Sequence, residues 1–285
     1  MHQLTIVLIL AAVITASCWI LSVTTKDYSW VDRTWSLSPI AYAWIFAWPT
    51  FATGAAGLRT LLMATVITLW GIRLTFNFAR KGGYSGMEDY RWSIVRASMK
   101  NWQWQIFNFL FTSVFQNVLL VLITLPVWLS AQYSTDFGFR DVVLILLFAL
   151  LLVGETTADQ EQWNFQQAKK HAGGHLEPGF VTTGMFHFSR HPNFFCELGQ
   201  WWVIYALGAS ALVSSGASIG LLGGVVNWSV LGAVVLTVLF IGSTMMTESI
   251  SAKKYPAYAE YRRTTSAIIP LPPRKRSTQS EYTGN

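Results

Sequence analysis

The residues best suited to chemistry lie in a short segment, 184–197, with the sequence GMFHFSRHPNFFCE. A proline in it suits the first turn of a helix, whose exposed amides can bind an anion, and Arg190 adds a guanidinium beside them. Asn193 and Glu197 then share one helix face, with Trp201 one turn further along. We therefore predict a small-molecule site here, with an anion-binding end and a polar stripe that descends along the helix.

Two carboxylates, Glu155 and Asp159, lie four residues apart at the end of another apolar run. Acidic side chains near the C-terminal end of a helix oppose its dipole, so another group must favour them. A bound ligand or an arginine partner would do so, and a solvated interfacial helix is the structural alternative.

A third polar segment begins inside an apolar stretch with Arg73 and Asn77, which share a helix face. A charge within the bilayer costs at least about 2.5 kcal/mol, so Arg73 is expected to be functional or paired, for instance with Glu155. The following loop, with Tyr84 and Tyr90, mixes donors, acceptors and phenols. It suits either a binding role or an ordinary basic loop.

The C-terminal part adds Glu248 and three tyrosines that recur every third residue, Tyr255, Tyr258 and Tyr261. Their spacing places the phenols on one helical face, where they would complete the site. Taken alone, such a stripe is also typical of an aromatic belt at a membrane interface.

The elements that position these residues are predicted to be membrane-spanning helices. The chain is 52% hydrophobic and 12% charged, whereas globular proteins have about 25% charged residues. Apolar runs approach the roughly 20 residues needed to cross a bilayer. We place them at 4–23, 38–57, 60–80, 106–130, 140–158, 193–214 and 226–247. The prediction is an all-α polytopic membrane protein with about seven spans and a retained first helix.

The distribution of Lys and Arg predicts the orientation. If the C-terminus is cytoplasmic, every basic residue lies on that side except Arg59, Arg73 and Arg140. The N-terminus is then outside, and the net charge of +6 reflects topology and attraction to anionic membrane lipids rather than to nucleic acid. We expect one transmembrane domain over 1–273 and a disordered polar tail over 274–285. Oligomeric state and the identity of the membrane are left open.

Several other chemistries are disfavoured. Two HxxxH pairs suggest a metal centre, but one brackets a Gly-Gly pair that breaks helical presentation, and a membrane di-iron oxidase needs about twice as many histidines as are present. We therefore predict no metal. The sequence has no P-loop, no dinucleotide fingerprint after a strand and no nucleophile elbow. Its two cysteines lie in apolar runs and are expected to be packing residues.

Over residues 28–272 the chain resembles an uncharacterised membrane family grouped with the steroid 5-alpha-reductases. The resemblance rests on Trp70-Gly-x-Arg73-Leu-Thr, Gly82-Gly-Tyr84, Glu88-Asp-Tyr-Arg-Trp92, Ser189-Arg-His-Pro-Asn193 and Lys254-Tyr-Pro-x-Tyr258. It implies a seven-helix protein that binds NADPH in a cytoplasm-open cavity and reduces a carbon–carbon double bond conjugated to a carbonyl.

The resemblance implies that Asn193, Glu197, Glu155 and Asp159 contact the cofactor; we assign Arg190 to the 2′-phosphate on physical grounds. The reductases polarise the substrate carbonyl with a tyrosine in a His-Tyr-x-x-Arg pattern. The matching stretch here, residues 69–73, has no tyrosine. We list as candidate substitutes the phenols Tyr84 and Tyr90 and the acid Asp32, and as substrate-binding residues Arg73, Asn77 and Trp201.

The run from Arg190 through His191, together with Glu248 and the Tyr258–Tyr261 region, is also similar to isoprenylcysteine and phospholipid methyltransferases. That similarity implies S-adenosylmethionine, with Glu248 beside the sulfonium, as an alternative to NADPH. A non-catalytic lipid or sterol binder is a third possibility. The leading prediction is an NADPH-dependent membrane oxidoreductase that acts on a lipid-like substrate. Its cofactor is predicted also to contact His191, Glu248, Tyr255, Tyr258 and Tyr261.

Overall fold

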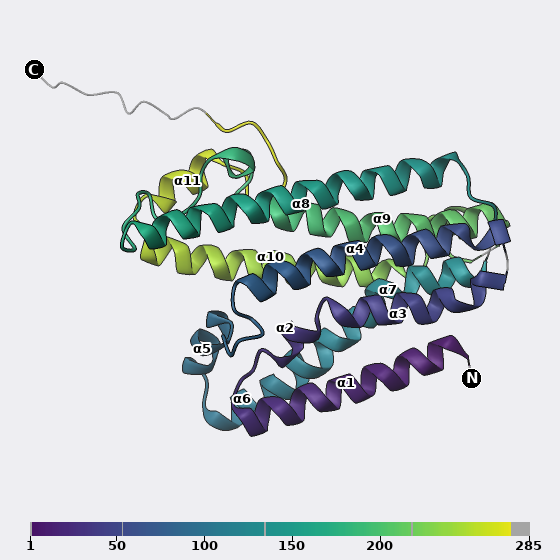
Figure 1. Ribbon diagram of the computed structural model, residues 1–285, viewed down its shortest axis with the longest axis horizontal. Helices are drawn as coiled ribbons and strands as arrows, with labels where there is room; N and C mark the ends of the chain where they lie inside the picture. The colour runs from purple at the N-terminus through teal and green to yellow at the C-terminus, as the bar shows by residue number, and fades with distance from the viewer. Residues whose placement is uncertain (1, 53, 134, 218, 275–285) are drawn as a thin grey trace, which may run out of the picture. The chain divides into compact units, whose positions relative to one another are not determined.

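The computed structural model describes residues 2–52, 54–133, 135–217 and 219–274, and the regular elements in these ranges are helices. The predicted disordered tail lies almost wholly outside them. The α-helices, labelled in Figure 1, are α1 (Gln3–Thr25), α2 (Trp30–Thr34), α3 (Leu37–Ala47), α4 (Leu58–Arg80), α5 (Tyr90–Ala97), α6 (Asn101–Phe107), α7 (Gln116–Gln132), α8 (Phe139–His171), α9 (Pro192–Ser215), α10 (Val230–Lys254) and α11 (Tyr258–Thr264). Short 3-10 helices occur at Trp48–Ala52, Gly54–Gly57, Gly184–His187 and Leu222–Gly224, and a π-helix, η3, at Asn108–Phe115.

The chain forms two compact units. Unit 1 comprises Met1–Leu150 and Gly199–Thr237, and unit 2 comprises Leu151–Leu198 and Val238–Asn285. The boundaries fall within α8, α9 and α10, so each of these helices contributes one part to each unit.

Unit 1 is built around α3, which packs against α1, α4 and α7 (Figure 1). Its core contains large side chains with no more than 1% of their surface exposed, among them Tyr42, Phe46, Met63 and Trp70. Apolar side chains on both the buried and the exposed faces of α1 fit a helix surrounded by hydrocarbon.

A buried ion pair ties α4 to α8 within unit 1. Arg59 Nε and Nη2 donate to the two carboxylate oxygens of Asp141 at 2.9 Å each, and both side chains are 1% exposed. Ser210 adds a third donor to the same carboxylate. With this many partners the charges are satisfied locally, which identifies the pair as a structural clamp.

Five helical stretches among the described residues are long and apolar enough to cross a membrane: Gln3–Thr25, Leu58–Arg80, Asn101–Gln132, Phe139–His171 and Val230–Lys254. The protein is therefore an all-helical membrane protein, and five of the predicted spans coincide with these helices. The remaining two predicted spans, 38–57 and 193–214, are not among these five helices, for separate reasons.

The stretch 38–57 is not one helix. It is α3, of 11 residues, followed by two 3-10 turns. Pro49 lacks the N–H that would continue the helical ladder, and Gly54 has a positive φ of 59°, which a continuing helix cannot accommodate. The other prediction, 193–214, is one helix, α9, but most of its side chains are buried. Because protein surrounds it, α9 contains Ser, Gly and Gln, which lower its hydropathy.

Unit 2 contains the second part of α8, the first turns of α9, the second part of α10, and α11. It has a small core of Ala158, Val181 and Phe186, with Phe165 and Met185 packed against it. The polar residues after the apolar part of α8 remain helical to His171 because Glu, Gln, Ala and Lys are good helix formers.

Candidate functional site

Glu248, near the end of α10, has several charged partners in unit 2. Arg190, just before α9, donates from Nε to Oε1 at 2.6 Å and from Nη2 to Oε2 at 3.0 Å. This is the bidentate geometry that a planar guanidinium prefers. The two side chains are 8% and 6% exposed, so the pair is largely withdrawn from solvent.

Further groups surround this pair. Arg190 Nη1 also donates to the main-chain carbonyls of Arg262, at 3.1 Å, and Thr265. His191 Nε2 lies 3.3 Å from Glu248 Oε1, and Arg262 Nε lies 3.3 Å from Oε2. Four of the five N–H groups of Arg190 are thus engaged within unit 2. The predicted contact of Arg190 with a cofactor phosphate stays a prediction.

Residues 265–271, here called the strap, run beside residues 188–191 and are held by backbone hydrogen bonds. Arg190 N donates to Ser266 O at 2.8 Å, His191 N to Ala267 O at 3.0 Å, and Leu271 N to Phe188 O at 3.0 Å. Ser189 Oγ adds a bond to Ile268 O at 2.7 Å. The polar segment singled out in the sequence therefore fixes the course of the strap as well as the start of α9.

The three tyrosines of the predicted stripe surround the ring of Phe180. The ring centroids of Tyr255, Tyr258 and Tyr261 lie 5.7, 4.9 and 5.3 Å from that of Phe180. Tyr261 also donates its hydroxyl to the carbonyl of Phe186 at 2.5 Å. Burial raises the pKa of Tyr258 to about 12 and that of Tyr261 further still. These two phenols are accordingly neutral packing and hydrogen-bonding groups at physiological pH.

Tyr255 has a different environment. Burial raises its pKa, but a hydrogen bond from Lys169 Nζ at 2.8 Å and the nearby ammonium of Lys254 outweigh that effect and lower the pKa below its ordinary value. Lys169 also donates to the carbonyl of Gly179. Tyr255 is thereby fixed beside two cations.

The remaining predicted cofactor residues also belong to unit 2. Glu155, Asp159 and Glu197 are 2%, 6% and 8% exposed, while Asn193 is half-buried at the start of α9. Glu155 and Asp159 share a face of α8, and Asn193 and Glu197 share a face of α9. Buried carboxylates of this density in a membrane protein are costly, and mark either a polar ligand or an internal network.

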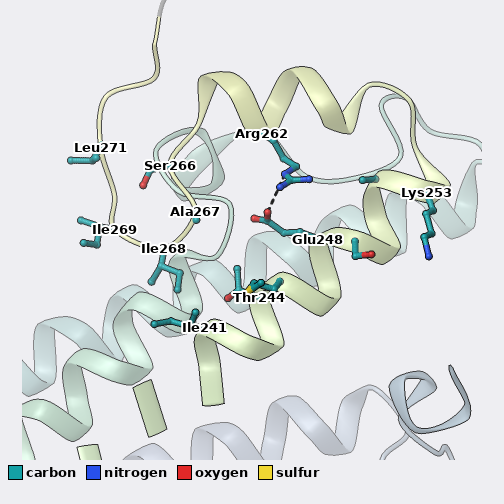
Figure 2. Close-up of a pocket in the computed structure, with 13 residues that line it drawn as sticks. Ile241, Thr244, Glu248, Lys253, Arg262, Ser266, Ala267, Ile268, Ile269 and Leu271 are labelled. Atoms are coloured by element: carbon teal, nitrogen blue, oxygen red, sulfur yellow. Dashed lines mark ion pairs between the residues drawn. The ribbon is translucent and has the colours of Figure 1, made fainter. Parts of the chain in front are cut away.

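A cavity of about 790 Å³ opens beside the Glu248 cluster (Figure 2). Ligand pockets typically have volumes of roughly 300–1,000 Å³. One wall is a face of α10 from Ile241 to Lys253, and the other is formed by Arg262 and the strap. Figure 2 shows the Arg262 side chain reaching from α11 toward Glu248 on α10. The cavity thus has an apolar part and one charged end.

The predicted catalytic residues lie in unit 1 and make structural contacts there. Tyr84 donates its hydroxyl to the carbonyl of Arg33 at 3.0 Å, and its side chain is 43% exposed. Asp32 accepts a hydrogen bond from Trp92 Nε1 at 3.0 Å. Burial raises the pKa of Asp32 above its ordinary value. Tyr90 is 54% exposed at the start of α5. Their proposed roles in proton donation stay predictions.

The predicted substrate residues also lie in unit 1. Asn77 is buried and accepts a hydrogen bond from Arg80 Nε at 2.9 Å. Trp201 packs edge-on against Trp70 with 4.9 Å between ring centroids. Arg73 lies on the same helix, α4, one turn before Asn77. These contacts describe packing, and the substrate assignment stays a prediction.

Sequence reasoning did not select Lys253, Arg262 or the apolar walls of the cavity as site residues. One signal was available: the apolar run Ala267-Ile-Ile-Pro-Leu271 follows a strongly basic helix end and is too short to span a membrane. Such a run must either pack against the protein or contact lipid. Its pairing with residues 188–191 has no local sequence signal.

Comparisons with known proteins identify a family and a relative of this chain. The family model described as "Protein of unknown function (DUF1295)" matches residues 18–265. A protein of Schizosaccharomyces pombe described as "Uncharacterized protein C594.04c" is 34% identical over 279 residues, covering 92% of this chain and 78% of the relative. No solved structure matches the chain.

Proposed function

The chain belongs to the DUF1295 family, and we propose that it is a membrane oxidoreductase that uses NADPH to reduce a conjugated carbon–carbon double bond of a lipid-like or steroid-like substrate. The observation that carries the proposal is the grouping, in unit 2, of buried Glu155, Asp159 and Glu197 with Asn193. The resemblance to steroid 5-alpha-reductases adds the reaction type.

The chemistry of this set suits a nicotinamide dinucleotide. Carboxylates accept hydrogen bonds from ribose hydroxyls, and the Asn193 side chain can both donate to and accept from a carboxamide. The first-turn amides of α9, with the helix dipole behind them, suit the pyrophosphate. The assignment of Arg190 to the 2′-phosphate stays a prediction; its guanidinium holds Glu248 and two main-chain carbonyls.

When bound, NADPH supplies the hydride. The protein's own part is to orient the cofactor through Asn193 and Glu197, and to place a hydrogen-bond donor at the substrate carbonyl, where negative charge develops. Tyr84 and Tyr90 are the proposed donors, with Asp32 as the alternative acid.

The proposal includes the finer topology. We propose seven crossings, with the α3 region and α9 joining the five helices that qualify by length and hydropathy, an external N-terminus and a cytoplasmic C-terminus. The basic residues in the last turn of α10, at 253–254, and in the last turn of α11, at 262–263, would then face the cytoplasm.

The test is the affinity of the detergent-purified Glu197→Gln variant for NADPH. Removing one carboxylate charge while keeping the side-chain shape should weaken binding about tenfold, or about 1.4 kcal/mol, the scale of a hydrogen bond to a charged group. Circular dichroism should show unchanged helix content. Unchanged affinity in the folded variant would remove Glu197 from the site.

A further inference from the structure

The cavity beside α10 has two apolar walls that are themselves exposed. Ile241 and Met245 lie one turn apart on α10 and are 47% and 70% exposed. Ile269 and Leu271 on the strap are 60% and 52% exposed, and Ile268 also lines the cavity. Exposed apolar surface that lines a groove marks a ligand or membrane contact.

The strap can lie next to hydrocarbon because part of its backbone is already satisfied. The carbonyls of Ser266, Ala267 and Ile268 accept hydrogen bonds from residues 189–191, and Leu271 N donates to Phe188 O. Irregular backbone is tolerated at membrane depth only where its polar groups are satisfied by the protein. The wall is thus formed without a ligand.

The charged end of the cavity has an excess of positive charge. Among its lining residues, Glu248 contributes one negative charge and Lys253 and Arg262 contribute two positive charges. Arg190 contacts Glu248 bidentately from outside the lining and cancels its charge. Two cationic charges remain, and the Arg262 side chain is 51% exposed.

We propose that this groove binds an anionic phospholipid, with one acyl chain against the α10 and strap walls and the phosphate at the Lys253 and Arg262 end. The apolar walls favour a lipid over a free phosphate or a nucleotide, which would gain nothing from them. The proposal concerns binding and does not depend on the reaction proposed above.

The test is photo-crosslinking with phosphatidylglycerol that has a diazirine in its acyl chain, with phosphatidylcholine of the same chain as the comparison, on the full-length protein in nanodiscs. Peptide mapping should place the phosphatidylglycerol label on 241–249 and 266–271, at several times the yield with phosphatidylcholine. Equal yields, or label confined to other helices, would overturn the proposal.

Arg262→Gln should lower labelling by phosphatidylglycerol about fivefold, since one basic residue at the membrane surface is worth about 1 kcal/mol. Arg263→Gln is the matched control: it removes the same charge from the next residue, which is paired with Glu260 and does not line the cavity. If Arg263→Gln lowered labelling by phosphatidylglycerol as much as Arg262→Gln does, general surface charge would explain the effect, and the proposed site would be contradicted.

Met245→Trp fills the groove at an exposed position without touching any ion pair, and should abolish labelling of the strap while the helix content is retained. Retained strap labelling in this variant would contradict the groove. Competition by NADPH completes the experiment: displacement of the lipid would assign Lys253 and Arg262 to the cofactor and overturn the lipid proposal, whereas persistence of the label supports it.

Discussion

Arg190 and Glu248, 58 positions apart in the sequence, are joined by two hydrogen bonds that fix the start of α9 against the end of α10. The same guanidinium holds the carbonyls of Arg262 and Thr265, where the chain leaves α11 for the strap. One side chain therefore connects the two helices, the strap and the charged end of the cavity.

Removing both partners of this pair should cost less stability than the sum of removing each one alone. Arg190→Gln or Glu248→Gln leaves one buried charge without its bidentate partner, at a cost of about 3–5 kcal/mol, and the double variant should be less destabilised than the two single changes combined. Thermal unfolding of the detergent-purified variants measures this. Glu260→Gln, at an exposed pair, should cost about 0–1 kcal/mol. Additive effects at Arg190 and Glu248 would show that the pair is not energetically coupled.

Alanine substitution at two glycines of α10 should change the stability of the protein in opposite directions. A Cβ on Gly232 would lie 2.5 Å from the backbone carbonyl carbon and oxygen of Leu122, which cannot yield without separating the helices. A Cβ on Gly242 would meet nothing within 4 Å. We expect Gly232→Ala to lower the unfolding temperature markedly, and Gly242→Ala to stabilise by about 0.5–1 kcal/mol through helix propensity. Equal responses would refute the close approach of α10 to α7.

Deletion of a buried phenolic hydroxyl tests the packing around Phe180. Tyr261→Phe leaves the carbonyl of Phe186 without its donor, and should cost about 1–3 kcal/mol because the site is buried. Tyr84→Phe removes the same type of bond, to the carbonyl of Arg33, from a side chain that water reaches. Its loss in unfolding temperature should be clearly smaller, and a reversed order would contradict the assigned bond.

Alkaline titration distinguishes Tyr255 from Tyr258. Tyr255 should ionise below its usual pKa of 10.0, because Lys169 and Lys254 favour the phenolate, and Tyr258 only at about 12. Between pH 10 and about 12 the folded protein keeps the Tyr258 proton, whereas the unfolded chain loses it. The free energy of unfolding therefore falls as the pH rises above about 10. Ultraviolet tyrosinate absorbance should lose its earliest component in Tyr255→Phe. Lys169→Gln should move that component to higher pH, and an unchanged curve in both variants would contradict the contact.

The sequence was sufficient for the features that depend on local composition. The apolar runs that became α1, α4 and α10 and the polar stripe of Asn193 and Glu197 on α9 could be predicted because hydropathy and helical spacing are local properties. The single helix expected over 38–57 is not formed, because hydropathy does not register that Pro49 lacks an N–H and that Gly54 adopts a positive φ.

Long-range pairings could not be predicted in this way. Nothing in the local pattern links Arg190 to Glu248 rather than to a ligand, or the strap to residues 188–191. The amino-acid composition of Asn108–Phe115 does not distinguish its π-helix from an α-helix, although π-helical segments often mark functional sites. Tyr255, Tyr258 and Tyr261 have the spacing of a helical stripe, yet they are brought together by Phe180.

The central claim is that unit 2 binds a nicotinamide cofactor, and the most direct measurement is calorimetric titration of the detergent-purified protein with NADPH and with S-adenosylmethionine, side by side, in wild type and in Asn193→Ala. We predict that NADPH binds to the wild type, that Asn193→Ala weakens this binding at unchanged helix content, and that S-adenosylmethionine does not bind. Binding of S-adenosylmethionine alone would contradict the account in favour of methyl transfer, and binding of neither would contradict it in favour of a lipid-binding protein without a nucleotide cofactor.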